Sequence, residues 1–210
     1  MIAPDSWPQR RFSQAIAEGD GISVIPHLRG DLAALARAAE EAGAEALAVE
    51  SVDEIRLLRP STRLPLLVRR VAPDPDSLRA ARAAGADACL LTFEELAGED
   101  ELLEELVATA AELGLDCALD VRDEEELERV LELVDPEILV LSERDPDKDE
   151  AELERTLDLL PDVPAGKLVV SESPVTTREQ ILALERAGVD AVLLGLEVPA
   201  ATLAELTGRS

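Results

Sequence analysis

The feature of this sequence that most limits its fold is a strand-length apolar run that recurs along the chain, followed each time by a polar turn and a helical pattern. Continuous apolar character is typical of strands buried on both faces, as in parallel sheets. The eight runs cover residues 22–25, 46–49, 66–68, 88–91, 117–119, 138–141, 168–170 and 191–194. Apolar residues at the three- and four-residue spacing of amphipathic helices occupy 32–42, 78–84, 101–113, 124–133, 151–159 and 178–187.

Glycines mark the points at which several helical patterns stop before the next apolar run. The residue after a helix often takes a left-handed conformation, which glycine adopts without steric cost. Gly43, Gly85, Gly114 and Gly188 stand at such points. The repeat of about 20 to 30 residues is that of one strand-helix unit, and eight such units close a barrel.

The fold class predicted from this repeat is α/β, as a single compact (β/α)8 TIM barrel. We expect one domain over residues 1–210, with an N-terminal extension or helix at 1–20 and the barrel over 21–210. An open doubly wound sheet is the competing architecture, but no Gly-x-Gly-x-x-Gly motif follows any of the runs.

The charge balance limits the partners. Twenty Lys and Arg residues against 46 Asp and Glu residues give a net charge of −26, and such a field repels polyanions. The aromatic residues, Trp7, Phe12 and Phe93, are too few for a base-stacking platform. We therefore expect no nucleic-acid partner, and whether the acidity reflects adaptation to salt stays open.

Neither a membrane segment nor a metal site is expected. No apolar run approaches the roughly 20 residues that cross a bilayer, and Arg10 and Arg11 precede no apolar signal segment. Cys89 and Cys117 form no Cys-x-x-Cys motif, and with the single His27 they cannot supply a zinc tetrad. We predict a cytoplasmic monomer or homodimer with two buried free thiols, no metal and no cofactor.

Candidate functional residues are the polar ones that follow each apolar run, because reacting groups in such barrels sit at the carboxyl ends of the strands. They are His27, Arg29, Glu50, Arg69, Arg70, Thr92, Asp120, Arg122, residues 142–144, residues 171–173 and Gly195.

Five segments of the chain carry a resemblance to a known family: Ala-Gly-Ala-Asp-Ala-Cys-Leu-Leu (84–91), Val-Arg-Asp-Glu-Glu-Glu-Leu (121–127), Arg144-Asp145, Val-Ser-Glu-Ser (170–173) and Ala-Gly-Val-Asp-Ala-Val-Leu-Leu-Gly (187–195). In this order they resemble indole-3-glycerol-phosphate synthase over about residues 12–206. The resemblance implies a phosphate-binding TIM barrel that closes an indole ring, with dehydration and decarboxylation of a carboxyphenylamino-deoxyribulose phosphate, in tryptophan biosynthesis.

The resemblance also assigns catalytic positions, and several are substituted. His27 and Arg29 stand where the family has a Glu and a Lys after strand one, and Arg69 replaces its strand-three Lys. An arginine cannot deliver a proton near neutrality because its pKa exceeds about 12. Asp120 replaces the strand-five Glu and keeps the carboxylate with a shorter reach.

The later strands keep more of the family pattern. The family's Asn-Asn-Arg becomes Ser142, Glu143 and Arg144. After strand seven, Glu172 is retained as a catalytic position and Ser173 as a phosphate-binding one. Gly195 and Leu196 take the remaining phosphate-binding places.

Other departures from the family concern loops and backbone donors. Pro174 replaces a glycine and has no N–H to offer a phosphate. The family has a longer loop after strand one, and here that loop is missing, since Asp31 follows Gly30 at the point where the loop would begin. The segment 51–60 is also shorter than in the family. Such loops cover the substrate and exclude water, so their loss weakens the case for chemistry.

Structural roles compete with functional ones at several positions. Arg69 and Asp120 form either a charge pair around a ligand or a salt bridge that caps the barrel. His27 is either a base or a hydrogen-bonded filler. Residues 123–126 are most simply an acidic helix N-terminus.

Three functions stay open. The first is a diverged lyase of the resembled family. The second is a noncatalytic paralogue with a binding or regulatory role. The third is an enzyme that uses His27, Arg69 and Asp120 on another small phosphorylated or carboxylated metabolite.

Overall fold

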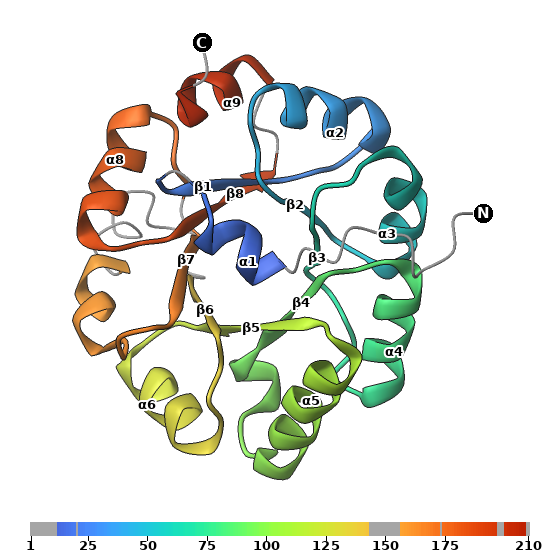
Figure 1. The fold of residues 1–210 in the computed structure, drawn as a ribbon. Coiled ribbons are helices and arrows are strands. Elements are labelled where there is room, and N and C mark those ends of the chain that lie inside the picture. The colour runs from blue at the N-terminus through green and yellow to red at the C-terminus, as the bar shows by residue number, and fades with distance from the viewer. Residues whose placement is uncertain (1–11, 20, 143–155, 173, 197–199, 209–210) are drawn as a thin grey trace.

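The computed structural model describes residues 12–19, 21–142, 156–172, 174–196 and 200–208. Its strands form a closed, all-parallel barrel in the order of the sequence, which confirms the predicted TIM barrel (Figure 1). The strands are β1 (Ser23–His27), β2 (Leu47–Val49), β3 (Leu66–Val68), β4 (Ala88–Thr92), β5 (Asp116–Val121), β6 (Ile138–Ser142), β7 (Leu168–Glu172) and β8 (Ala191–Leu196). Every predicted apolar run lies within or overlaps one of them.

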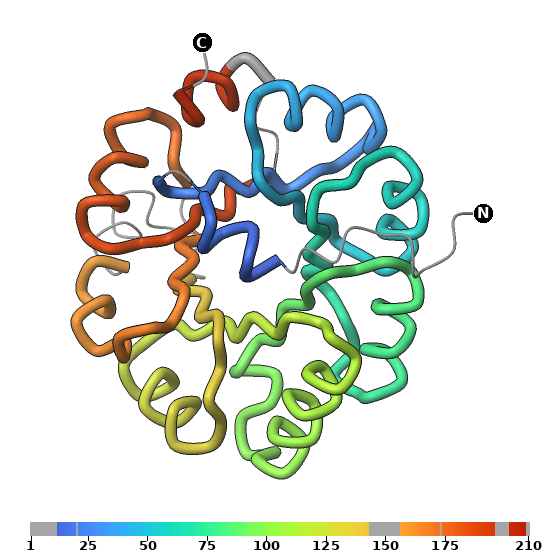
Figure 2. Tube along the Cα trace, viewed as in Figure 1, coloured from blue at the N-terminus to red at the C-terminus, as the bar shows by residue number. Residues whose placement is uncertain are grey.

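Helices surround the barrel, as the tube in Figure 2 also shows. The described helices are α1 (Phe12–Ala17), α2 (Leu32–Glu41), α3 (Val52–Leu58), α4 (Pro75–Ala84), α5 (Asp100–Leu113), α6 (Glu124–Leu133), α8 (Arg178–Ala187) and α9 (Ala200–Thr207), with 3-10 turns η2 (Arg59–Ser61), η3 (Phe93–Leu96) and η4 (Leu160–Asp162). Of the helix predicted at 151–159, residues 156–159 are helical and the others lie outside the described residues.

Two details differ from the sequence prediction. The segment after β2 contains a helix that was not among the predicted ones, α3, which Ser51 caps in a capping box with Glu54. Several strands also run past their apolar stretch, so that His27, Thr92 and Glu172 end β1, β4 and β7. The hydrogen-bond ladder continues into these polar residues, which apolar patterning alone does not mark.

The interior of the barrel is packed with small and branched side chains. Ala46, Ala48, Ala88, Ala118 and Ala191 lie there together with Ile, Leu and Val residues, and all are buried. Because alanine side chains are small, the strands alone do not fill the barrel interior, and side chains from another element complete the inner core.

Helix α1 completes that interior by closing the amino-terminal end of the barrel. Phe12 and Ile16 belong to the inner core, and the Ser13 N–H donates to the carboxylate of Asp116, the first residue of β5, at 2.9 Å. Figure 1 shows α1 lying across the middle of the ring of strands. The other end of the barrel is therefore the one left for a ligand.

Aspartates that precede the next strand tie the amino-terminal end together. The Asp87 carboxylate accepts from the Leu66 N–H at 3.0 Å and from Arg59 at 2.9 Å, and the Asp190 carboxylate accepts from the Val169 N–H at 2.7 Å. Both aspartates follow a glycine with positive φ, Gly85 and Gly188, which ends the preceding helix. The resembling Ala-Gly-x-Asp motifs therefore act in this structure as backbone anchors.

The cysteines are both free and are register partners on β4 and β5. Cys89 is buried as predicted, but Cys117, which was also predicted to be buried, is only partly buried. In the part of the chain that the structure describes, we find no helix with the length and apolar character needed to traverse a bilayer.

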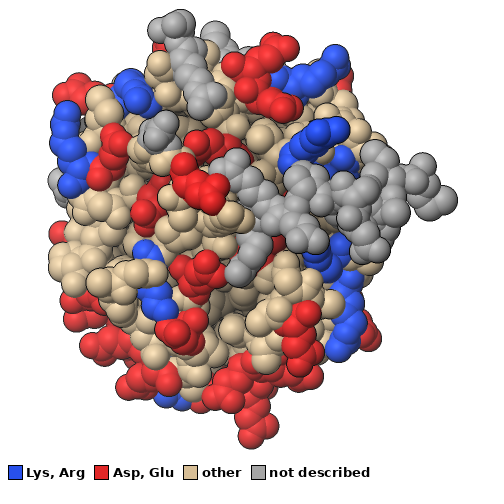
Figure 3. All heavy atoms as spheres, in the orientation of Figure 1, with Lys and Arg blue, Asp and Glu red and all other residues tan. Residues whose placement is uncertain are grey.

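Acidic side chains are spread over the face seen in Figure 3, most densely along the edge formed by α5 and α6. The residues there include Asp100, Glu125, Glu128 and Glu132, with Arg129 among them. Arg129 pairs with Glu132 at 3.0 Å and also with Asp100. The excess negative charge is thus distributed on the surface and compensated only locally.

Candidate active site

The side chains at the carboxyl end of the barrel follow from strand geometry. Side chains alternate between the two faces of a strand, so the residue two positions after an inner-core residue also faces inward. The ladder continues past β2 and β3, because the Arg69 N–H donates to Val49 O and the Arg70 N–H to Glu50 O, both at 2.9 Å. The inward layer that results consists of His27, Glu50, Arg69, Thr92, Asp120, Ser142, Glu172 and Gly195.

Two arginines at the end of β3 are held by carboxylates from opposite sides of this layer. Arg69 Nη2 donates to Glu172 Oε1 of β7 at 2.5 Å, with both side chains mostly buried. Arg70 Nε lies 2.7 Å from Glu50 Oε1, and Arg70 is largely exposed. Arg69 therefore crosses the barrel mouth, whereas Arg70 lies along its rim.

His27 is an ionisable group of this layer that is almost fully enclosed. Its side chain is 4% exposed, and Nε2 lies 3.4 Å from Glu50 Oε2 without forming a hydrogen bond to any described residue. Burial, together with the charges of Arg69 and Arg29, lowers the pKa of His27 to about 4, while the charge of Glu54 opposes the shift. At neutral pH the imidazole is uncharged.

Asp120 and Ser142 form a buried pair between neighbouring strands. The Ser142 hydroxyl donates to the Asp120 carboxylate, and both residues are buried. Asp120 is paired with Val140 in the sheet, so Ser142 reaches it from two residues further along β6. The hydroxyl holds the carboxylate in one orientation at the barrel mouth.

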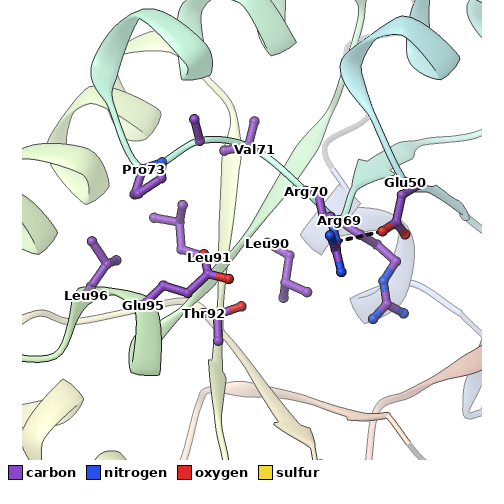
Figure 4. A pocket seen from close by; sticks show the side chains of 11 residues that line it. Glu50, Arg69, Arg70, Val71, Pro73, Leu90, Leu91, Thr92, Glu95 and Leu96 are labelled. Atoms are coloured by element: carbon purple, nitrogen blue, oxygen red, sulfur yellow. Dashed lines mark ion pairs between the residues drawn. The ribbon is translucent and has the colours of Figure 1, made fainter.

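A cavity of about 530 Å³ opens beside this layer (Figure 4). Its polar lining includes Glu50, Arg69, Arg70, Thr92 and Glu95. Figure 4 shows the Glu50–Arg70 ion pair at one side of the cavity and Glu95 at the other. Apolar side chains between these groups complete the wall: Val71, Ala72, Pro73, Leu90, Leu91 and Leu96.

The comparisons with known proteins agree with this architecture. A family model described as "Indole-3-glycerol phosphate synthase" matches residues 26–205. The chain belongs to the indole-3-glycerol phosphate synthase family. The indole-3-glycerol phosphate synthase of Acidithiobacillus ferrooxidans is 40% identical over 137 residues, which are 65% of this chain and 51% of the relative. The enzyme of a Geobacillus species is 33% identical over 170 residues, which are 77% of this chain and 65% of the relative.

The chain therefore spans about half the length of the first of these indole-3-glycerol phosphate synthases and less than two thirds of the second. The resemblance stated from the sequence is confirmed at the level of the family. The geometry of the barrel mouth bears on the roles of the individual residues.

Most of the predicted family positions come together. His27, Arg69, Asp120, Ser142 and Glu172 all belong to the inward layer. The family position at Arg29 differs, because this side chain is exposed two residues past β1. Its charge still reaches the site, since it helps to lower the pKa of His27.

The predicted phosphate-binding positions are described only in part. Gly195 is exposed in β8, and no heavy atom would lie within 4 Å of a Cβ built on it. Leu196 ends β8, but its side chain is not among the described ones. Ser173 lies outside the described residues, as does the predicted catalytic position Arg144.

The structure gives contacts for three of the positions that sequence analysis left between a structural and a functional role. Arg69 forms an ion pair with Glu172, and Asp120 accepts a hydrogen bond from the Ser142 hydroxyl. Nε2 of His27 has no hydrogen-bond partner among the described residues. The interpretation of 123–126 as a helix start holds, because Asp123 caps α6 by accepting from the Glu126 N–H at 2.9 Å.

Sequence reasoning gave no site role to Glu50, Arg70 or Thr92, although all three were among the polar residues after the strands. A signal for two of them was present, because Glu50 and Thr92 stand two positions after the inner-core residues Ala48 and Leu90. No group of three or more His, Cys, Asp or Glu side chains within the described ranges is placed to hold a metal ion.

Proposed function

We propose that this chain is a noncatalytic member of the indole-3-glycerol phosphate synthase family that binds a small carboxylated or phosphorylated metabolite at the carboxyl end of its barrel. The observation that carries the proposal is that the basic side chains described at the barrel mouth do not include one that can donate a proton near neutral pH. Arg69 stands where the family has its strand-three lysine, and it is held by Glu172 at 2.5 Å. A guanidinium orients and neutralises an anion but does not act as an acid near pH 7.

The ring closure that the family carries out requires a general acid at the ketose carbonyl. His27 does not meet this need, because with a pKa of about 4 it is already deprotonated at neutral pH. The sequence holds two lysines. Lys167 pairs with Asp135 just before β7, at the closed end of the barrel, and Lys148 lies outside the described residues. Within the described mouth, the basic groups are therefore suited to binding.

The family's own reaction is the second candidate, and one observation favours it. Asp120 and Glu172, at the positions of two family carboxylates, both belong to the inward layer. Carboxylates at these places could serve a second proton transfer if an acid were supplied. This alternative would give the chain a role in tryptophan biosynthesis in the cytoplasm.

The two candidates are separated by measuring turnover and binding on one sample. The purified chain is mixed with the carboxyphenylamino-deoxyribulose phosphate, indole formation is followed by fluorescence, and binding is followed by calorimetry. We expect saturable binding without turnover above buffer. The Arg69→Ala variant should lose most of this binding, whereas Arg37→Ala, which removes an exposed arginine of α2, should retain it.

Turnover that disappears in Asp120→Ala would establish the lyase in place of the binding protein. If that turnover also disappears in Lys148→Ala, the reaction requires this lysine. A folded sample that shows neither binding nor turnover contradicts both candidates.

A further inference from the structure

Glu50 divides its two carboxylate oxygens between two partners of different kinds. Oε1 lies 2.7 Å from Nε of Arg70, and Oε2 lies 3.4 Å from Nε2 of His27. The first partner is 83% exposed and the second 4% exposed. Glu50 thus stands between a guanidinium at the edge of the cavity and an imidazole buried beneath it.

The contact between Glu50 and Arg70 is one that a ligand could replace. It uses a single guanidinium nitrogen, and exposed ion pairs contribute only about 0 to 1 kcal/mol. Both Nη groups of Arg70 lack a hydrogen-bond partner among the described residues, so a planar carboxylate could bind them in a bidentate manner. Arg69 lines the same cavity, and the apolar wall at Val71 and Pro73 could receive the body of an organic acid.

His27 provides a second place for the displaced carboxylate. Its Nε2 atom is buried and has no hydrogen-bond partner within the described part of the chain, a costly state for a polar group. The charged groups facing it are Glu50 and Glu54 from the β2–α3 segment, Arg69 from β3 and Arg29 beyond its own strand. The residues of β8 carry no charge, Glu205 of α9 is exposed, and Asp120 and Glu172 face the mouth from the other strands.

We propose that, in the free chain, the Glu50 carboxylate occupies the position on Arg70 that a ligand carboxylate takes when it binds. The ligand then displaces Glu50 toward His27, and His27 takes up one proton from the solvent. The proton adds to the imidazole, the Glu50–Arg70 ion pair is replaced by one between Glu50 and His27, and no other covalent bond is made or broken. This inference rests on the proposed binding function and specifies its ligand class, a carboxylate attached to an apolar body.

The sign of the pH dependence follows from the electrostatics. In the free chain, burial and the Arg69 charge keep the pKa of His27 at about 4. A full carboxylate at Nε2 favours the charged form and raises this pKa. The bound state then holds more protons than the free state, so binding strengthens as the pH falls. If the pKa returns to about 6.5, affinity at pH 5.5 exceeds that at pH 8 by about tenfold.

The test is calorimetric titration of the full chain with benzoate at pH 5.5, in buffers of different ionisation enthalpy. We expect uptake of nearly one proton for each benzoate bound at pH 5.5 and almost none at pH 8. His27→Gln and Glu50→Gln should each abolish the proton uptake, and Arg70→Ala should weaken binding at least tenfold. Arg63→Gln removes an exposed arginine ahead of β3 and should change neither quantity.

The outcomes separate this inference from the proposed function. Benzoate binding without proton uptake, or with uptake that persists in Glu50→Gln, overturns the transfer of Glu50 but leaves the binding function intact. Absence of benzoate binding, while the sugar phosphate binds the unchanged chain and Arg70→Ala equally well, overturns the assignment of a carboxylate to Arg70. Absence of binding by either compound overturns the proposed function itself.

Discussion

Removal of the Arg59 side chain should destabilise the barrel in a way that depends on pH. Arg59 donates to Asp87 at 2.9 Å and to the carbonyl oxygens of Thr62 and Leu64 at 2.7 and 2.8 Å, with 9% of its side chain exposed. Arg59→Met keeps much of the packing volume but removes the nearer cation from the buried Asp87 carboxylate, which retains only the more distant Arg82 at 4.0 Å. Breaking a buried ion pair by removing one partner costs about 3 to 5 kcal/mol.

The pH dependence comes from Asp87. Burial already raises its pKa above the ordinary value of 3.8, against the effects of the Leu66 N–H and the Arg59 charge. Without Arg59 the pKa rises further. Below the unfolded-state pKa, Asp87 is protonated in both states and imposes no charge penalty. As the pH rises through the folded-state pKa the penalty develops fully, so the loss in Arg59→Met should be larger at pH 8 than at pH 4.5.

The assay is urea unfolding followed by circular dichroism at both pH values. Arg56→Met is the matched control, because Arg56 pairs only at the surface with Asp53, and it should change stability by less than about 0.5 kcal/mol. Adding Asp87→Asn to Arg59→Met should recover part of the loss at pH 8. Equal losses at the two pH values, together with no recovery in the double variant, would refute the reasoning.

Three further predictions concern the closure of the barrel, a helix cap and the surface. Phe12→Ala removes a residue of the inner core that is 1% exposed and should lower the free energy of unfolding by about 3 to 5 kcal/mol; a loss below 1 kcal/mol in urea melts would mean that α1 does not seal the barrel. Ser51→Ala breaks the capping box of α3 and should cost about 1 kcal/mol, whereas an unchanged urea midpoint would contradict the role of this cap. Because the net charge is −26, raising NaCl from 0.02 to about 1 M should screen self-repulsion and raise the thermal midpoint; a flat or falling midpoint would contradict this view of the surface.

The fold could be predicted because one periodic signal repeats eight times and each strand is buried on both faces. Helix α3 escaped prediction since it has seven residues, of which only Ile55 and Leu58 are buried. Such a short helix gives too few apolar positions for a period. The local signal was the Ser51-x-x-Glu54 capping box.

The members of the mouth could be foreseen more readily than their contacts. Two-residue alternation from the inner core places Glu50 and Asp120 in the same layer. The pairing of Arg69 with Glu172 joins residues 103 positions apart, and it depends on which long side chain reaches across the barrel. The burial of His27 Nε2 without a hydrogen-bond partner among the described residues likewise depends on enclosure by several strands, which no local pattern contains.

The most direct test of the account is a nitrogen-15 NMR titration of the imidazole of His27 in the free chain. The sequence has a single histidine, so its ring signals need no further assignment. We predict a neutral ring from pH 8 down to pH 5 and a midpoint at about 4. A midpoint near 6.5, the ordinary value for an exposed histidine, would contradict the conclusion that His27 is buried and uncharged. It would also contradict the proposal that the described barrel mouth lacks a proton donor, because that proposal depends on an uncharged His27.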